Sequence, residues 1–364
     1  MSYKYPVYQP SLQGNEKKYV LDCLDTTWIS SKGKYINQFE EQFALKIGTK
    51  HAASVSNGTV ALHVALVALG IGEGDEVIVP SLTYIASVNA IAYTGAKPVF
   101  VDSTTDTWHM NTEDIKKKIT PRTKAVIAVH LYGSSCEMDE IVALCKESSL
   151  FLVEDCAESF GTYYKNKHTG NFGDIASFSF FGNKTITTGE GGMVTTNNPK
   201  LHEKVIHYKG QGLAKNREYW HDVIGYNYRM TNICAAIGLA QLEQADEFIN
   251  QKIQIANWYK KYIGTTEVLF QEEKEYIRNT YWMCSLVVKH EADRDALRNY
   301  LKENGIETRP FFHPAHTMPV YFESISYPVA EHLSKNGMNI PSYPLLEEED
   351  VKNISECINS FFIK

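Results

Sequence analysis

The sequence lacks the features that mark several large classes of protein. No run of about 18 apolar residues is present, which argues against a membrane-spanning helix. The first twenty residues contain no apolar run behind a basic patch, so we expect no secretion signal. Lys and Arg total 36 against 43 Asp and Glu, and they form no block. A formal charge of −7 without clustered cations argues against nucleic-acid binding.

Paired cysteines and the common nucleotide-binding loops are also absent. The seven cysteines are scattered, odd in number, and include no C-x-x-C, which argues against a zinc ribbon or a disulfide scaffold. We interpret them as reduced thiols of a cytoplasmic protein. Neither G-x-G-x-x-G nor G-x-x-x-x-G-K-[ST] occurs, so the sequence lacks the motifs typical of dinucleotide-binding folds and of NTPases.

Short β-branched runs alternate with helical stretches over residues 50–200. The runs are nearly continuous in apolar character, which is typical of a parallel sheet covered on both faces. The expected strands are 76–79, 97–101, 125–129 and 151–153, and the expected helices are 59–69, 87–93, 112–119 and 138–148. Asn111 and Asp139 are candidate caps for the last two helices. This pattern predicts an α/β architecture.

The pattern of predicted helices and strands changes near Met230. Residues 231–263 form one long helical pattern, and a strand at 281–288 and helices at 292–304 and 349–361 follow it. We predict two domains: residues 1–245 as a large domain with a mostly parallel sheet, and residues 246–364 as a smaller α+β domain.

The first chemical motif is Ser-Asn-Gly-Thr at residues 56–59, between a strand-like run and an Ala/Leu-rich helix. Gly58 permits close backbone approach, and Thr59 has a free hydroxyl in the first helical turn. A helix N-terminus presents unpaired N–H groups to an anion. An ordinary capped helix start is the alternative.

The second motif is an acid pair, Glu154-Asp155, at the end of an apolar strand, with Glu158 three residues further on. Open α/β sheets bind ligands at this edge. A largely desolvated Asp155 carboxylate needs a partner, and a protonated heterocyclic nitrogen would serve. A helix cap or an internal salt bridge is the alternative.

The third motif places Lys184 between the aromatic run 178–181 and the glycine-rich run 189–192. A lysine used as an amine nucleophile must be partly desolvated. The alternative is a surface lysine, which the neighbouring aromatic residues disfavour. Pyridoxal phosphate requires all three features together: an anion site, a buried acid and a lysine shielded from water.

The order of these segments resembles the fold type I sugar-nucleotide aminotransferases over nearly the whole chain. The resemblance rests on SNGTVAL, PSLTYIAS, EDCAESFG, GDIASFSFFGNKTITTGEGGMV and GYNYRMTNICAAIGLAQL. It implies that Lys184 bonds covalently to pyridoxal 5'-phosphate and that Asp155 holds the pyridine nitrogen protonated. The further cofactor contacts that it implies are Gly58, Thr59, Tyr84, Glu158, Ser179 and, across a homodimer interface, Asn227.

The resemblance also implies the substrates. The donor would be L-glutamate and the acceptor GDP-4-keto-6-deoxy-D-mannose, aminated at C4 for surface polysaccharide synthesis; a dTDP- or UDP-linked keto-deoxy sugar is the alternative. The expected contacts of the sugar nucleotide are Trp28, Ser30, Lys32, Arg229, Arg309, His313 and His316.

The residues argue against three other functions. A dehydratase of the same fold would carry His where this chain has Lys184. A non-catalytic scaffold would not need the set of Lys184, Asp155 and Ser179. A nicotinamide-dependent dehydrogenase would need the missing glycine motif. His313 and His316 lack a clear third ligand nearby, so a structural or substrate-binding role is favoured over a metal site.

Overall fold

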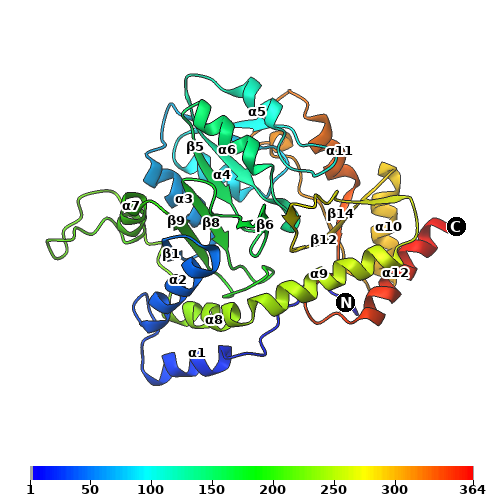
Figure 1. The fold of residues 1–364 in the computed structure, drawn as a ribbon, viewed down its shortest axis with the longest axis horizontal. Helices are drawn as coiled ribbons and strands as arrows, with labels where there is room; N and C mark the ends of the chain where they lie inside the picture. The colour runs from blue at the N-terminus through cyan, green and yellow to red at the C-terminus, as the bar shows by residue number, and fades with distance from the viewer. Residues whose placement is uncertain (1–2, 364) are drawn as a thin grey trace.

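A computed structural model describes residues 3–363, and its centre is a seven-stranded sheet (Figure 1). The strands in sheet order are β1 (His51–Val55), β9 (Gly192–Thr196), β8 (Ile175–Ser179), β5 (Phe151–Asp155), β4 (Thr123–Val129), β2 (Glu76–Pro80) and β3 (Lys97–Val101). Only β9 runs against the other six. The predicted α/β class with a mostly parallel sheet is confirmed.

The parallel directions bring distant parts of the sequence to one edge of the sheet. Asp155 ends β5 and Ser179 ends β8, and these two strands are neighbours. The segment 56–59 follows the end of β1, which runs the same way. All three motifs therefore meet at the carboxyl edge, where such sheets bind ligands.

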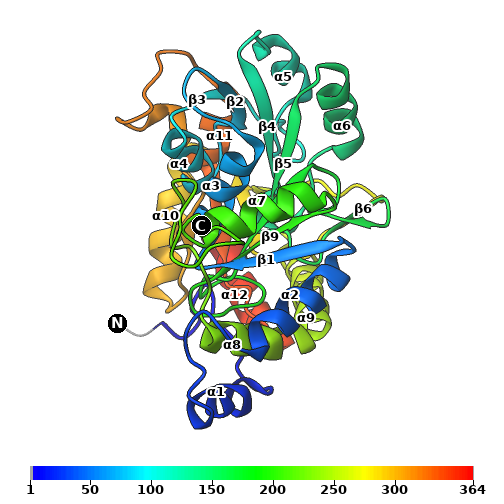
Figure 2. The same cartoon turned by 90° about the vertical axis from the view of Figure 1, so that its left-hand side faces the viewer.

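Helices cover both faces of this sheet because successive side chains of its strands point alternately into one apolar cluster on one face and two apolar clusters on the other. Val77 and Val79 pack with α3 (Gly58–Leu69), whereas Ile78 packs in the cluster that includes residues of α6 (Met138–Glu147). In Figure 2 the sheet runs between α3 and α4 on one side and α5 and α6 on the other. The remaining helices of this region are α1 (Glu16–Asp25), α2 (Lys34–Ile47), α4 (Ala86–Tyr93), α5 (Thr112–Lys118) and α7 (Pro199–Lys209).

The helix ends test the two predicted caps. Asn111 caps α5, since its side chain accepts hydrogen bonds from the N–H groups of Glu113 and Asp114. Asp139 does not cap α6: this helix begins one residue earlier, at Met138, so the prediction is wrong at this helix.

The long helix expected over 231–263 is two helices, α8 (Asn232–Glu243) and α9 (Ala245–Tyr262), separated at Gln244. The break lets α8 pack on α1 and α2 while α9 packs on α12 (Glu348–Ile363). Figure 1 shows the two helices running from the central sheet to the C-terminal part of the chain. The sequence has no Gly or Pro at this point to signal the break.

The C-terminal part is built on an antiparallel sheet in the order β10 (Val268–Phe270), β12 (Cys284–Val288), β14 (Gly337–Ile340), β13 (Arg309–Pro310). Helices α10 (Glu291–Glu303) and α11 (Pro328–Asn336) complete it. A small sheet of β6 (Tyr163–Tyr164), β7 (Lys167–His168) and β11 (Ile277–Arg278) joins the two parts. None of the helices within residues 3–363 combines the length and hydropathy needed to cross a bilayer.

The domain boundary at residue 245 remains a proposal. It falls beside the break between α8 and α9. The first residues, however, lie against the C-terminal part, because Tyr5 pairs with Ile306 and packs in its apolar cluster.

Candidate active site

A cavity of about 600 Å³ lies at the carboxyl edge of the central sheet. Eight of the predicted site residues line it: Gly58, Thr59, Tyr84, Asp155, Glu158, Ser179, Lys184 and Arg309. Most of its wall belongs to the large sheet and its loops, and the C-terminal part closes one side with residues such as Trp282 and Asn339. The three motifs of the sequence thus form one site.

One end of the cavity is suited to an anion. Asn57 caps α3 by accepting a hydrogen bond from the Val60 N–H at 3.0 Å, and the N–H groups of the first turn point toward the cavity end of the helix. Gly58 lies so close to Ser179 that a Cβ at Gly58 would come within 2.7 Å of the Ser179 Cβ. A phosphate here would meet backbone N–H groups and the hydroxyls of Thr59 and Ser179.

The buried carboxylate of Asp155 is held in place by two donors. The Ser87 hydroxyl donates to Oδ2 at 2.7 Å, and the Ala157 N–H donates to Oδ1 at 3.1 Å. Asp155 is 5% exposed and lines the cavity. No basic side chain forms an ion pair with it among the described residues. It therefore remains available to a positively charged group of a ligand.

Lys184 is largely buried beside Glu158, with Nζ 3.9 Å from Oε1. Burial lowers the pKa of Lys184, and the negative charges of Glu158 and Asp155 oppose this effect. Burial likewise raises the pKa of Glu158, against the charge of Lys184 and the hydrogen bond from the Tyr132 N–H. A lysine with a lowered pKa in a cavity has the reactivity that nucleophilic chemistry needs, and the surface-lysine alternative is excluded.

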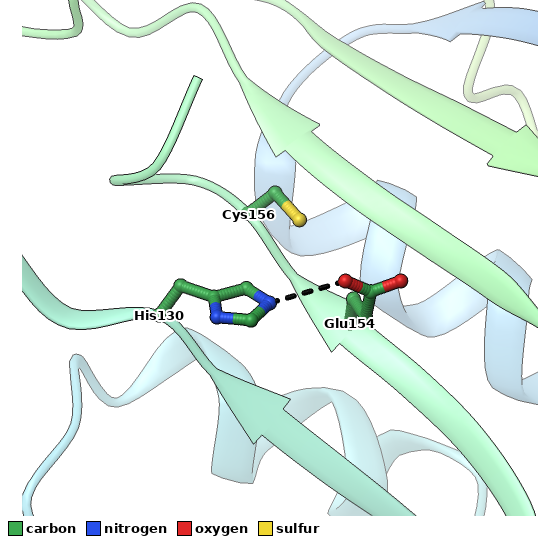
Figure 3. A group of neighbouring side chains, drawn as sticks. All are labelled: His130, Glu154 and Cys156. Carbon is green, nitrogen blue, oxygen red and sulfur yellow. Dashed lines mark hydrogen bonds and ion pairs between the residues drawn. The ribbon is translucent and has the colours of Figure 1, made fainter. Parts of the chain in front are cut away.

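The other acid of the pair, Glu154, does not line the cavity; Figure 3 shows its carboxylate beside the His130 ring. It accepts hydrogen bonds of 2.7 Å from the N–H groups of Gly170, Phe172 and Gly173, and His130 Nε2 lies 3.2 Å from its Oε2. Successive residues of a strand point to opposite faces, which explains the different roles of Glu154 and Asp155.

Ligand atoms of His130, Glu154 and Cys156 lie within 4.8 Å of one another, which is close enough to hold a metal ion. Their hydrogen bonds do not suit that role. His130 Nδ1 accepts from the Cys136 N–H at 3.1 Å, and both oxygens of Glu154 accept from the backbone. Burial raises the pKa of the Cys156 thiol well above its usual value, so it stays protonated. The group is a structural network.

We expect Glu154→Gln to destabilise the fold without changing the cavity. Burial raises the pKa of Glu154. The opposing effects are larger: His130 lowers the pKa by its hydrogen bond and its charge, and so do the N–H groups of Gly173 and Gly170. The pKa therefore lies below its ordinary value of 4.5. Loss of the charge leaves a buried N–H donor unsatisfied and costs about 3 kcal/mol of unfolding free energy at neutral pH.

The sign of the pH dependence follows from the lowered pKa. The stabilisation is complete above the ordinary value of 4.5 and is lost as the pH falls through the lower folded value. Chemical denaturation should therefore show a difference between wild type and variant that shrinks in acid. Glu113→Gln, at an exposed pair with Lys116, is the matched control and should cause no measurable loss. Equal stability of wild type and Glu154→Gln at pH 7 would contradict this interpretation.

Three predicted substrate contacts, Trp28, Ser30 and Lys32, lie on an exposed loop and do not line the cavity of this chain. The buried Asn232 holds the loop: its side chain donates to the Trp28 carbonyl at 2.7 Å, and its N–H donates to the Ser30 carbonyl. The loop is therefore ordered by α8 rather than by the cavity.

Asn227 and Arg229 also lie outside the cavity, on the exposed strip before α8. The Arg229 guanidinium donates to Asn227 Oδ1 at 3.1 Å. Arg229 pairs with Val55 at the end of β1, so the strip runs beside the anion-binding end of the cavity. Both side chains are free to face another molecule.

The two histidines occupy different environments, and neither lines the cavity. His313 is exposed. His316 is buried, with Nδ1 2.6 Å from the Ser81 hydroxyl and Nε2 3.4 Å from a carboxylate oxygen of Glu331. Its surroundings favour the structural alternative, so the prediction of substrate contact receives no support at His316.

The cavity wall also contains residues that were not predicted, among them Trp282 and Asn339 of the C-terminal part. Trp282 precedes β12, and Asn339 lies on β14 directly opposite Arg309. Both are more than 90 residues from Lys184 in the sequence, so only the arrangement of the two sheets reveals them. An isolated Trp or Asn in a strand gives no sequence signal of function.

Comparison with known proteins agrees with this geometry. The profile of the DegT/DnrJ/EryC1/StrS aminotransferase family matches residues 10–359. GDP-perosamine synthase of Escherichia coli O157:H7 is 61% identical over 358 residues, which is 98% of each chain. GDP-perosamine synthase of Vibrio cholerae is 49% identical over 362 residues, 98% of this chain and 99% of the relative. The aminotransferase TlmJ from Streptoalloteichus hindustanus superposes with a TM-score of 0.95 at 28% identity and 99% coverage of both chains. The chain belongs to the DegT/DnrJ/EryC1/StrS aminotransferase family.

Proposed function

We propose that this aminotransferase moves the amino group of L-glutamate to C4 of GDP-4-keto-6-deoxy-D-mannose and so makes GDP-perosamine for surface polysaccharide (O-antigen) synthesis. The observation that carries the proposal is the single cavity that unites Lys184, Asp155 and the N-terminus of α3. Full-length similarity to two GDP-perosamine synthases supports the choice of acceptor. The seven free cysteines support a cytoplasmic location.

Pyridoxal phosphate is the cofactor of this enzyme, and the donor set of the cavity fits it. The N-terminus of α3, Thr59 and Ser179 would hold the phosphate; Asp155 would pair with the ring nitrogen, and Lys184 would hold the aldehyde carbon. The close approach of Gly58 to Ser179 leaves this end of the cavity free of side chains. When bound, the cofactor supplies a carbonyl that accepts the amino group and a ring that withdraws electrons.

The protein residues then have separable tasks. Asp155, fixed by Ser87 and Ala157, would hold its carboxylate against the ring nitrogen. Lys184 moves a proton to and from the carbon that bears the amino group, which requires its neutral amine; burial favours that form. Arg309, half exposed on the cavity wall, is a cation for the charged groups of the substrates.

A coupled assay tests the acceptor. Enzyme and L-glutamate are incubated with GDP-, dTDP- and UDP-linked 4-keto-6-deoxy sugars, and release of 2-oxoglutarate and the position of the new amine are scored. We expect turnover with the GDP sugar and amination at C4. Turnover with a dTDP or UDP sugar alone would replace the acceptor in the proposal and leave the aminotransferase chemistry intact.

We further propose a homodimer with shared active sites. The segment between α7 and α8 extends away from the sheet in Figure 1 and exposes large apolar side chains, with Tyr219 at 92% and Ile224 at 90% exposure. Such exposure is typical of an interaction surface. The same segment leads to Asn227 and Arg229, whose side chains would complete the site of the second copy.

Mixing two inactive variants tests the shared site. In the proposed dimer, each site takes Lys184 from one chain and Asn227 from the other. A dimer of one Lys184→Ala chain and one Asn227→Ala chain therefore has one site with both substitutions and one site with neither. We expect recovery of about a quarter of wild-type activity after random mixing. Each variant mixed with itself is the control. No recovery, together with proof of mixed dimers, would contradict the shared site.

A further inference from the structure

We propose that Tyr8 and Trp282 are positioning residues for Lys184: each donates a hydrogen bond to one of two consecutive backbone carbonyls, and the Trp282 ring supports the lysine amine. The proposal rests on the role proposed for Lys184. It adds two groups that reach the lysine from parts of the chain remote in sequence.

The backbone around Lys184 depends on side chains for its hydrogen bonds. Residues 182–188 form neither helix nor strand, so their carbonyls have no regular partners. The Tyr8 hydroxyl donates to the Lys184 carbonyl at 2.6 Å, and the Trp282 indole N–H donates to the Asn183 carbonyl at 2.7 Å. Two adjacent peptide groups are therefore fixed from outside their own loop.

Trp282 also contacts the reactive end of the lysine. Lys184 Nζ lies 3.9 Å from the centre of the indole ring, the same distance as from the Glu158 carboxylate. An aromatic face attracts an ammonium group. Because one side chain holds the backbone and supports the amine, it limits the conformations that Lys184 can adopt.

The indole itself is rigidly placed. Trp282 is 4% exposed, and its ring is parallel to that of Tyr132 with centroids 6.4 Å apart. Gly133 packs so tightly there that a Cβ would lie 2.4 Å from the Trp282 backbone nitrogen. A fixed ring can hold the lysine in one place.

Tyr8 is equally well anchored, and by the C-terminal part of the fold. The preceding Tyr5 pairs with the chain at residues 305–307, and the Val7 carbonyl accepts from the Ser342 N–H at 3.2 Å. Tyr8 is thus tied to the C-terminal part of the fold, and Trp282 directly precedes its strand β12, so the segment that carries Lys184 is bonded to the C-terminal part as well as to the large sheet.

Proton transfer is sensitive to such placement, because a 1 Å displacement of a reacting group can cost about 10²-fold in rate. We expect Tyr8→Phe to slow the reaction of the enzyme with glutamate alone, followed by cofactor absorbance without sugar, about tenfold. The KM for glutamate should stay within about twofold of wild type, since Tyr8 is not among the residues that line the cavity.

Tyr259→Phe is the matched control. The Tyr259 hydroxyl is buried and donates to a backbone carbonyl, that of Pro341, at 2.8 Å, but it lies away from Lys184. Both variants lose one buried hydrogen bond, so both should lower the melting temperature, and only Tyr8→Phe should slow the glutamate reaction. Equal rates in the two variants would overturn the proposal. If Tyr8→Phe fails to fold, Trp282→Phe, which loses the N–H and keeps a ring, provides the same test.

A second readout uses the enzyme stripped of cofactor. The rate at which Lys184 takes up pyridoxal phosphate is measured against pH, which reports the pKa of its amine. Trp282→Leu removes the aromatic ring that attracts the ammonium form of Lys184. The pKa of the amine should therefore fall, and the pH profile should move to lower pH by about 0.4 to 1.5 units. Trp282→Phe should leave it in place. An unmoved profile in Trp282→Leu would overturn the role of the ring.

Failure of the roles proposed for Tyr8 and Trp282 can be distinguished from failure of the proposed function. If wild-type enzyme reacts with glutamate but carries the cofactor on a lysine other than Lys184, the proposed function fails at its site. If Lys184 carries the cofactor and the Tyr8 and Trp282 variants behave as wild type, only the present inference fails.

Discussion

Replacing Lys184 with alanine is expected to lower turnover at least about 10⁴-fold, the upper range of what a positioned acid–base group contributes. The reason is that no second group can take its place. Among the described residues that line the cavity, Lys184 is the only amine, and Glu158 beside it is held by the Tyr132 N–H. The measurement is release of 2-oxoglutarate from glutamate in the presence of the GDP-linked keto sugar.

Lys252→Met is the control for this variant. Lys252 is the other deeply buried lysine whose pKa is lowered by burial, to about 8, and its amine donates to the Ser342 carbonyl outside the cavity. Because this amine also lies 5.2 Å from the centre of the Tyr8 ring, its replacement should lower stability and slow turnover by no more than the roughly tenfold expected of Tyr8→Phe, far less than Lys184→Ala. Turnover of Lys184→Ala within tenfold of wild type would contradict the assignment of the reactive amine.

Asp155→Asn is expected to reduce turnover by about 10- to 150-fold. The variant keeps the shape of the side chain, its oxygen can still accept from the Ala157 N–H, and its NH2 group can donate to the Ser87 hydroxyl, but it removes the negative charge. A hydrogen bond to a charged group contributes about 1.5–3 kcal/mol, which corresponds to this range of rates. Initial rates at saturating glutamate and sugar measure the effect.

The neighbouring Glu154→Gln is the informative comparison, because it changes the same chemical group one residue earlier on the same strand. Its side chain faces the backbone of Gly170 and Gly173 instead of the cavity. We expect it to lose stability and keep its turnover at temperatures where it is folded. The opposite assignment, with Glu154→Gln inactive and Asp155→Asn active, would contradict the geometry.

Much of the fold follows from local sequence patterns. All four predicted strands between residues 76 and 153 exist, with ends displaced by at most two residues, because buried parallel strands carry long apolar runs. The break between α8 and α9 could not be predicted, since Gln244 is a good helix former and the cause is packing against different partners. Strand β13 is only two residues long and has no pattern of its own.

The site was predictable where its residues follow strand ends. Asp155, Ser179 and Lys184 are placed by the parallel sheet, whose direction the alternating pattern predicts. Residues that reach the Lys184 segment from elsewhere, such as Tyr8 and Trp282, carry no local signal because their partners are distant in sequence.

Reduction of the native enzyme with borohydride, followed by peptide mapping, identifies the lysine that carries the cofactor. We expect pyridoxal phosphate to become attached to one lysine, Lys184, because its buried amine lies in the same cavity as Asp155 and the N-terminus of α3. Attachment to Lys252, the other buried lysine with a lowered pKa, or to any other lysine, would contradict this assignment.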